Sequence, residues 1–197
     1  LSNIEGPAGA ANRARLAEGI PEQRAHFDYP GQTFGFHYDS SLVTGDGTPE
    51  PPTEVETYTP TARPGHRAPH IPARFGGRNI SIIDLFDLEA FTLLAGPKGQ
   101  AWKAALDGLD RKSLPKVNAY LVGHGLDVEI DLEAWKDLYG VSDEGAVLIR
   151  PDGHVAWRSA GGGDADALIA ALFRSIGLNS ASEAEIATRK TVLNAAS

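Results

Sequence analysis

The sequence predicts a mixed α/β fold in which helices cover a central sheet. Three observations support this prediction. From residue 91 onward, short apolar runs typical of buried strands alternate with stretches whose apolar residues recur at helical spacing. Residues 145–158 contain two apolar runs on either side of Pro151-Asp-Gly153, which is the composition of a β-hairpin. Glycines and prolines stand at the ends of these runs, where turns are expected.

The expected elements follow the order strand, helix, strand, helix, strand, strand, helix. They are predicted over residues 91–95, 99–109, 117–122, 131–140, the two arms of 145–158, and 164–177, with a further short strand over 80–85. The strand–helix–strand unit must cross over right-handedly, which makes its two strands parallel, and the hairpin adds an antiparallel pair. Since a βαβ unit followed by a ββα unit is typical of the thioredoxin-like fold, we expect a thioredoxin-like domain over residues 79–178.

The segment before this domain is expected to be incomplete by itself. Residues 1–20 favour a weak helix whose apolar face is mostly alanine, which buries too little surface to be stable alone. Phe34, Phe36 and Tyr38 alternate with Gly35 and His37, which predicts a strand with an aromatic face. No local core covers these aromatics, so we expect residues 1–48 to be the remnant of a preceding domain.

Two further segments are predicted from composition. Residues 49–78 are expected to be a proline-rich linker that runs over a surface, because they carry seven of the chain's 13 prolines. Residues 179–197 are polar and helix-prone, and we expect a tail that caps the domain or docks on a partner.

Composition excludes several classes of function. The net charge of −8, without a clustered basic stripe, argues against nucleic acid as a partner. The absence of cysteine excludes disulfides, thiolate metal sites and thiol redox chemistry. No run reaches membrane-spanning length and no secretory signal is present, so a cytoplasmic protein without a membrane partner is expected. The chain also lacks methionine, which N-terminal processing or a fragment of a longer polypeptide would explain.

The segment around residues 63–70 carries the first candidate site. His66 and His70 stand four residues apart, a spacing that could hold a metal on a helix. Prolines within the segment forbid a regular helix, so no metal site is predicted. Arg63 and Arg67 have two open interpretations: pairing with carboxylates or carbonyls of another domain, or simple exposure to solvent.

Two acidic groups could also carry chemistry. Asp84, Asp87 and Glu89 are conceivable as an acid–base or metal site, but carboxylates near turns usually cap them, and capping is predicted. Three glycines at 161–163 precede a helix and could cradle a phosphate. Because acidic residues would repel an anion there, we expect Asp164 to be an N-cap instead.

The remaining candidates point to structure. Trp102, Trp135 and Trp157 fall on the apolar sides of predicted elements, where core or interface packing is expected. No serine–histidine–aspartate order stands out among the six histidines. The sequence therefore predicts no catalytic, cofactor-binding or metal-binding residue in this chain.

Several stretches together resemble a known family in their order and spacing across roughly residues 34–178. The stretches are Pro64-Gly-His-Arg-Ala-Pro-His70, Asp84-Leu-Phe86, Phe91-Thr-Leu-Leu-Ala-Gly96, Trp102 and Gly145-Ala-Val-Leu-Ile-Arg-Pro-Asp-Gly-His-Val-Ala-Trp-Arg158. They resemble the C-terminal region of FAD-dependent aromatic hydroxylases, the class A flavoprotein monooxygenases of the phenol hydroxylase and aromatic polyketide hydroxylase type.

The resemblance implies a fold and a reaction. In that family an FAD domain and a substrate domain precede a thioredoxin-like domain that lacks the redox Cys-x-x-Cys; here the corresponding turn reads Gly96-Pro-Lys-Gly-Gln100. The implied cofactors are FAD and NAD(P)H, and a flavin hydroperoxide transfers a hydroxyl group to a phenolic ring. A Gly-x-Gly-x-x-Gly fingerprint and a Gly-Asp-Ala-x-His flavin motif are absent here. No FAD-binding residue is therefore carried over, and the segment alone is expected to be inactive.

Two hypotheses follow. In the first, the chain is a structural and dimerisation domain of a flavin-dependent hydroxylase, with the missing FAD and substrate domains and a second copy as its partners. In the second, it is a free-standing, redox-inactive thioredoxin-like module that recognises a protein through the aromatics of residues 27–48 or the hairpin face.

Overall fold

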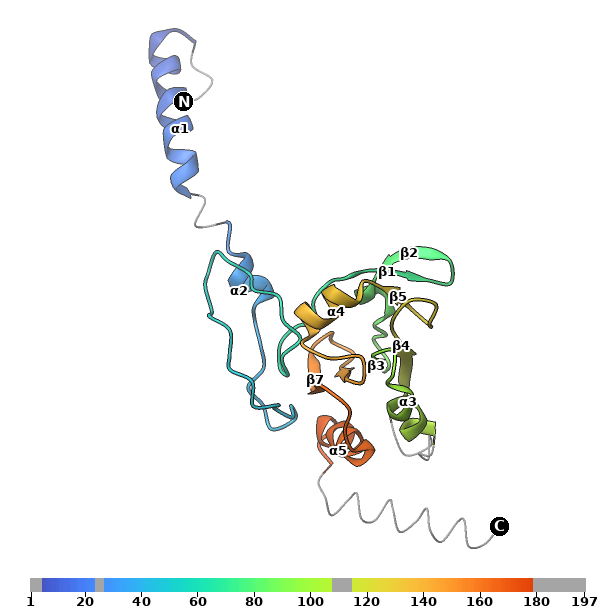
Figure 1. Ribbon diagram of the computed structural model, residues 1–197. Helices are drawn as coiled ribbons and strands as arrows, with labels where there is room; N and C mark the ends of the chain where they lie inside the picture. The colour runs from blue at the N-terminus through green and yellow to red at the C-terminus, as the bar shows by residue number, and fades with distance from the viewer. Residues whose placement is uncertain (1–4, 24–26, 108–114, 179–197) are drawn as a thin grey trace, which may run out of the picture. The chain divides into compact units, whose positions relative to one another are not determined.

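The computed structural model describes residues 5–23, 27–107 and 115–178 (Figure 1). Contacts within the chain divide it into two compact units. The first unit comprises Leu1–Phe36 and Pro51–Thr59, and the second comprises His37–Glu50 and Pro60–Ser197. Among the described residues, no helix has the length and apolar character needed to cross a membrane.

A four-stranded sheet forms the centre of the second unit, in the order β4-β3-β6-β7. Its strands are β3 (Phe91–Ala95), β4 (Val117–Leu121), β6 (Ala146–Ile149) and β7 (Val155–Ser159). β3 pairs in parallel with β4 and antiparallel with β6, and β6 pairs antiparallel with β7. The strand directions predicted from the βαβ unit and the hairpin are thus confirmed.

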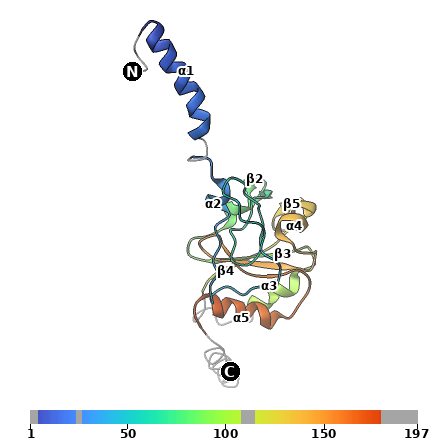
Figure 2. The same ribbon diagram turned by 90° about the vertical axis from the view of Figure 1, so that its left-hand side faces the viewer.

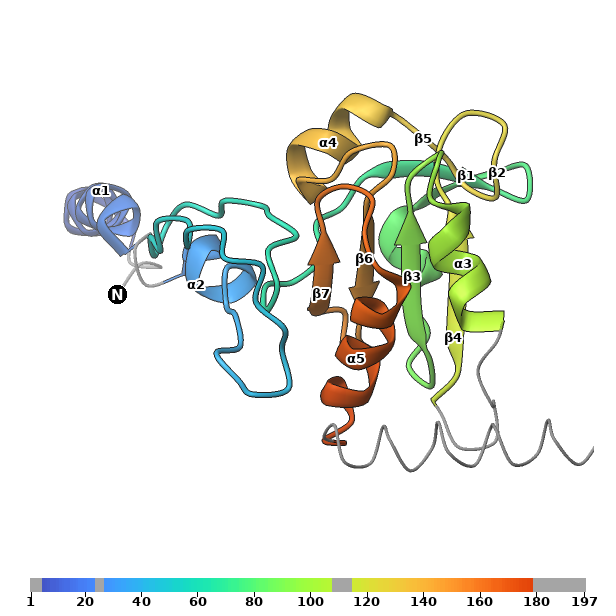
Figure 3. The same cartoon turned by 60° about the horizontal axis from the view of Figure 1, so that its bottom comes forward.

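Helices cover both faces of this sheet, as expected. They are α3 (Gln100–Asp107), α4 (Leu132–Tyr139) and α5 (Ala165–Ser175). Figures 2 and 3 show α3 and α5 on one side of the sheet and α4 on the other. Because successive side chains of a strand point to opposite faces, Leu93 packs under α3 and α5, whereas Leu94 belongs to the core on the α4 side.

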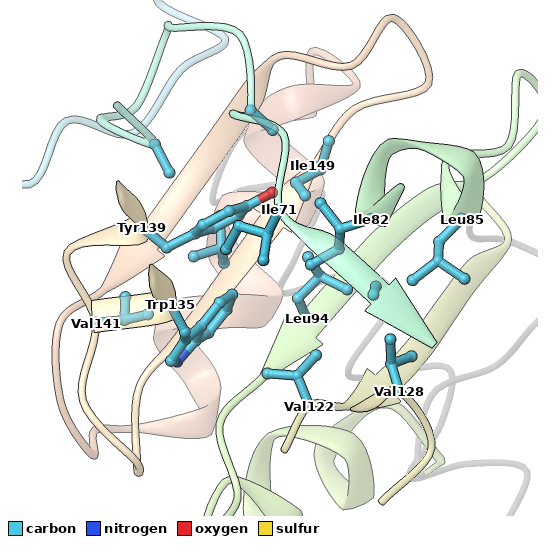
Figure 4. Close-up of a cluster of buried hydrophobic side chains, with 14 of the residues drawn as sticks. Ile71, Ile82, Leu85, Leu94, Val122, Val128, Trp135, Tyr139, Val141 and Ile149 are labelled. Atoms are coloured by element: carbon cyan, nitrogen blue, oxygen red, sulfur yellow. The ribbon is translucent and has the colours of Figure 1, made fainter. Parts of the chain in front are cut away.

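The core on the α4 side joins segments that are distant in the sequence (Figure 4). Trp135 and Tyr139 of α4 stack with ring centroids 4.7 Å apart, and both are fully buried. The Tyr139 hydroxyl donates to the Pro69 carbonyl at 2.8 Å. Ile71 and Ile82 are fully buried in the same cluster. Residues before position 79 are therefore part of this core.

That participation corrects the predicted linker over residues 49–78. Ala62, Ala68, Ile71 and Ala73 are buried, and a second sheet in the order β2-β1-β5 begins within the same range. It consists of β1 (Pro72–Phe75), β2 (Arg78–Ser81) and β5 (Glu129–Ile130). Small apolar residues bury the part of this stretch from Ala62 to Ala73.

The strand predicted over residues 80–85 is wrong from Ile82 onward. The strand β2 ends at Ser81, and a 3₁₀ helix, η2 (Ile82–Leu85), follows. The Ser81 hydroxyl accepts from the Ile83 amide, and Asp84 accepts from the Ser81 amide, which forms a capping box. These two side chains stop the strand because they satisfy the amides of a helical turn.

Other predicted boundaries are confirmed. Asp131 and Asp164 cap α4 and α5 by accepting from the amides two residues on, and Gly140 ends α4 in the left-handed conformation at φ 65°. The helix predicted over 99–109 corresponds to α3, although its predicted apolar residue Leu109 lies outside the described residues. The predicted tail over 179–197 also lies outside them.

In the residues of the first unit that the structure describes, there are two helices and little core. They are α1 (Pro7–Glu22) and α2 (Pro30–Phe34), and each buries one glycine only. The predicted aromatic strand from Phe34 to Tyr38 is wrong, because Pro30 starts a helical turn that runs to Phe34. Within the unit, Phe34 contacts Tyr58 with centroids 5.8 Å apart, and Gln32 donates its amide to the Val55 carbonyl.

Candidate functional site

The outer edge of β7 is covered by two polar segments, and this covered edge is the candidate site. We call residues 37–50 the strap. Thr44 of the strap donates its amide to the Ala156 carbonyl at 2.9 Å. From the other segment, Gly65 donates to the Val155 carbonyl at 2.8 Å, and the Val155 amide donates to His66 at 2.9 Å. The sheet edge is therefore paired by irregular chain, which blocks its use as a template for another strand.

Arg158 of β7 holds the strap in place from inside the domain. Its Nε donates to Asp46 Oδ2 at 2.7 Å, and its second and third nitrogens donate to the Tyr139 carbonyl and the Thr48 hydroxyl, both at 3.0 Å. Burial would raise the pKa of Asp46, but hydrogen bonds from Thr48 and Arg158 outweigh it and hold that pKa below its usual value. A charged carboxylate and guanidinium are thus paired in a largely buried latch.

Three histidines from three segments meet at this edge. The His37 ring stacks on the His66 ring, with centroids 4.7 Å apart and planes 14° apart. His37 Nε2 lies 2.9 Å from Glu50 Oε1. The ring of Tyr38 meets the His154 ring edge-on at 4.6 Å. The imidazoles therefore contact aromatic rings and do not converge on a common point.

Burial keeps two of these histidines neutral. It lowers the pKa of His66 to about 4, and the neighbouring His37 and Arg63 side chains add to the effect, with Glu50 opposing it. Burial also lowers the pKa of His154, against the opposing influence of Asp152. At neutral pH both rings are uncharged, which suits stacking in a buried setting. A general base would be expected to have a pKa near 7.

The turn of the hairpin contacts the segment that covers the β7 edge. Gly153 adopts φ 81°, donates to the Arg150 carbonyl at 2.9 Å, and accepts from the Ala68 amide at 3.0 Å. Asp152 Oδ1 accepts from the His154 amide at 3.1 Å, and its other oxygen accepts from Arg150 at 2.9 Å. The hairpin predicted over residues 145–158, with its glycine in the left-handed region, is confirmed.

The structure separates the two arginines that the sequence left open. Arg63 donates from Nε to the Thr48 carbonyl at 3.1 Å, so its partner belongs to this chain. Arg67 is exposed, and in the described part of the chain no group pairs with its guanidinium. His70 bonds through Nδ1 to the Ser81 hydroxyl at 2.6 Å, away from His66. The four-residue spacing of these histidines does not bring them together.

The predicted capping role is confirmed for Asp84 and Asp87 of the acidic cluster. Besides the capping box of Asp84, Asp87 Oδ1 accepts from the Glu89 amide at 2.9 Å. Asp87 Oδ2 accepts from Lys116 at 3.1 Å and from Asn118 at 3.2 Å. The Glu89 amide, followed by Lys116, lowers the pKa of Asp87, so this carboxylate stays ionised. In the ranges that the structure describes, no three metal-ligating side chains gather.

The glycines at 161–163 do not form a phosphate cradle. A side chain at Gly163 would stand 3.0 Å from Trp102, and one at Gly162 would stand 3.1 Å from the Glu144 carboxylate. Asp164 uses its carboxylate as the N-cap of α5. An anion at these three glycines would contact packed indole and negative charge. The glycines therefore do not fit the phosphate groups of FAD. Trp102, with Trp135 and Trp157, lies in the core, as predicted.

The latch between Asp46 and Arg158 is the feature that sequence reasoning missed. The Gly45-Asp46-Gly47 stretch indicated only a break in the chain, and Arg158 lies 112 residues away from its partner. The available signal was an arginine at the end of an apolar strand. Arginine is almost never fully buried unless paired, so this position called for an acidic partner elsewhere.

Comparison with known proteins identifies the family. Residues 61–178 match the family model described as aromatic-ring hydroxylase, C-terminal. Aklavinone 12-hydroxylase RdmE of Streptomyces purpurascens is 43% identical over 133 residues, which are 66% of this chain and 24% of that protein. The 2,4-dichlorophenol 6-monooxygenase of Cupriavidus pinatubonensis is 33% identical over 165 residues, 78% of this chain and 26% of that protein.

A solved structure agrees. The flavin-dependent monooxygenase PieE, in complex with FAD and substrate, superimposes with a TM-score of 0.73 and 31% identity over 90% of this chain and 31% of that one. The chain spans between about a quarter and a third of the length of these relatives. It belongs to the aromatic-ring hydroxylase family, whose C-terminal domain it matches.

Proposed function

We propose that this chain is the C-terminal part of an FAD- and NAD(P)H-dependent monooxygenase that hydroxylates phenolic aromatic compounds. The family match over residues 61–178 carries the proposal, because the relatives it connects are hydroxylases and monooxygenases of aromatic compounds. FAD supplies the oxygen-transfer chemistry in such an enzyme. The glycines at 161–163 do not fit an anionic dinucleotide, so we assign them no role in that chemistry.

The proposed role of the chain is structural. We infer that the second unit has a thioredoxin-like fold, which its strand order supports, and that the turn at Gly96–Gln100 has no redox function because it carries no cysteine. Its neutral, stacked histidines and its capped acids serve packing. The domain would cover the flavin- and substrate-bearing part of the enzyme.

The first unit supports this inference from its exposed apolar side chains. Leu16, Ile20, Phe27, Phe34 and Phe36 are between 49% and 81% exposed, a pattern typical of a surface that another part of the protein covers. We infer that the part of residues 1–48 up to about Phe36 belongs to a preceding domain. The strap, from residue 37 onward, belongs to the C-terminal domain. A homodimer remains part of the proposal and is measurable by analytical ultracentrifugation.

The test uses the longer polypeptide that contains this chain. Its purified product should be yellow, show a flavin absorption spectrum, and oxidise NAD(P)H faster when a phenol is added, with a hydroxylated product detected by mass spectrometry. A product that binds no flavin would refute the proposal. It would favour the alternative of a redox-inactive thioredoxin-like binding module.

A further inference from the structure

The His37 end of the strap lies on a buried imidazole. His37 and His66 form an antiparallel bridge, and their rings stack with centroids 4.7 Å apart and planes 14° apart. The Tyr38 amide donates to the Gly65 carbonyl at 2.9 Å, which ties the backbone of the strap to the same place. His66 is only 5% exposed, and one face of its ring is covered by the strap. Lifting this end of the strap would therefore expose His66 to water.

The contacts of His66 suit a neutral ring. Arg63 Nη1 lies 3.5 Å from His66 Nε2. Because a guanidinium has donors only, the contact is favourable while Nε2 offers its lone pair and the ring proton is on Nδ1. A proton on Nε2 would place two N–H donors against each other and a second positive charge beside Arg63. The geometry therefore opposes protonation of His66 while the strap is in place.

The titratable and charged groups that act on His66 come from three segments. His37 and Glu50 belong to the strap, Arg63 to the same segment as His66, and His154 to the hairpin. Glu50 is the only acid among them, and it also contacts His37 Nε2 at 2.9 Å. Burial, followed by His37 and Arg63, lowers the pKa of His66 from 6.5 to about 4. Since lifting the strap removes the burial, falling pH favours the lifted state between these two values.

The other end of the strap does not share this response. There Asp46 accepts from Arg158 at 2.7 Å, and Thr44 donates its amide to the Ala156 carbonyl. Although burial opposes it, hydrogen bonds from Thr48 and Arg158 hold the pKa of Asp46 below its usual value. The carboxylate therefore stays ionised in mildly acidic solution, and the latch keeps both of its charges. Acid weakens one attachment of the strap and leaves the other intact.

We propose that the stacked pair of His37 and His66 is an acid-sensitive clasp. Protonation of His66 releases the His37 end of the strap, while the latch at Asp46 keeps the other end on β7. Release frees the Gly65 carbonyl and uncovers the ring of His66, and the rest of the second unit stays folded. The clasp lies within the second unit, so it does not depend on the proposed function.

Amide hydrogen exchange of the 197-residue chain, measured by NMR and corrected for the intrinsic effect of pH, tests the clasp. The Tyr38 amide reports on the His37 end, and the Thr44 amide reports on the latch end. Between about pH 7.5 and about pH 5, protection of Tyr38 should fall by at least about tenfold, and that of Thr44 by less than about threefold. His66→Asn should abolish the fall at Tyr38, because an amide side chain gains no proton. His70→Asn is the matched control and should retain it, since His70 is exposed and bonds to Ser81.

Three results would overturn the clasp. The first is a fall at Tyr38 that is as large in His66→Asn as in the wild type, and the second is an equal fall at Tyr38 and Thr44. If His66→Asn exchanges rapidly at both pH values because the stack is lost, the Cε1 proton shift of His66 in the wild type decides. The ring should gain its proton over the same pH interval in which Tyr38 loses protection. A protonated His66 with Tyr38 still protected, or lost protection with a neutral His66, is the third contradicting result.

Discussion

The two units of the chain differ in how much of their apolar surface they bury. The second unit buries every residue of β3 and β6 and closes the free edge of β7 with the strap. The first unit has a helix of 16 residues, yet that helix buries only Gly9. Helix signals are present in both units, as a proline at the first turn of α1 and α2 and as an aspartate N-cap of α4 and α5, so local sequence does not separate them. What separates them is an apolar face with a partner inside the chain.

The largest expected effect comes from the core beside α4. Trp135→Ala should lower the free energy of unfolding of the second unit by about 3–5 kcal/mol, because it leaves a cavity under a fully buried stack with Tyr139. Phe27→Ala, at an 81% exposed position of the first unit, should change it by less than about 0.5 kcal/mol. Urea denaturation followed by circular dichroism measures both. Equal losses would abolish the contrast between the units.

The latch of the strap comes next. Arg158→Met should cost about 3 kcal/mol, since it strands the Asp46 carboxylate in a largely buried position. Adding Asp46→Leu to Arg158→Met should recover part of that loss, because both charges are then gone. Urea unfolding of the single and double variants decides the point. A double variant no more stable than Arg158→Met would mean that the buried charge is not the cause.

The hairpin turn offers a smaller perturbation. Gly153→Val should destabilise the domain by about 2 kcal/mol, because a β-branched residue resists a φ of 81°. Gly161→Val is the control, since Gly161 is not in the left-handed region and a Cβ there would meet only the Ser142 hydroxyl, at 3.9 Å. Thermal unfolding should separate the two. In the full-length protein, selective loss of hydroxylation by a stable Gly153→Val variant would show that the hairpin is more than a scaffold.

The smallest effect is a pH dependence from His66. The unfolded chain protonates this imidazole near its ordinary value of 6.5, whereas the folded chain does so at about 4. Between these values the unfolded state binds more protons, so the free energy of unfolding falls as the pH is lowered from about 6.5 to about 4. We expect a gradual loss of stability across this window. His66→Asn should flatten the slope in urea titrations; an unchanged slope would assign it to other groups.

The sequence predicted the structure correctly where a single local signal determines the conformation. Strand directions, the caps Asp131 and Asp164, and the turn at Gly153 follow from periodicity, carboxylates and a glycine at fixed places. It failed where two local signals competed. Residues 80–85 have strand composition throughout, but the capping box of Ser81 and Asp84 turns the chain into a 3₁₀ helix.

The candidate site was less accessible from the sequence than the fold. Its parts come from the strap, from residues 60–67 and from β7, and no spacing rule links Asp46 to Arg158 or His37 to His66. Proline density suggested a surface linker, whereas buried small residues such as Ala62 and Ala68 tie the same stretch to the core. Long-range pairing of this kind depends on the whole topology and is not encoded locally.

The central claim is that the second unit is self-contained and the first is completed by the preceding part of a flavin enzyme. Hydrogen exchange of α1, compared between this chain alone and the flavin-bound full-length protein, tests it most directly. We predict that α1 amides exchange at least about a hundredfold faster in the chain alone, while β3 and β6 are protected equally in both. Equal protection of α1 in the two samples would contradict the claim.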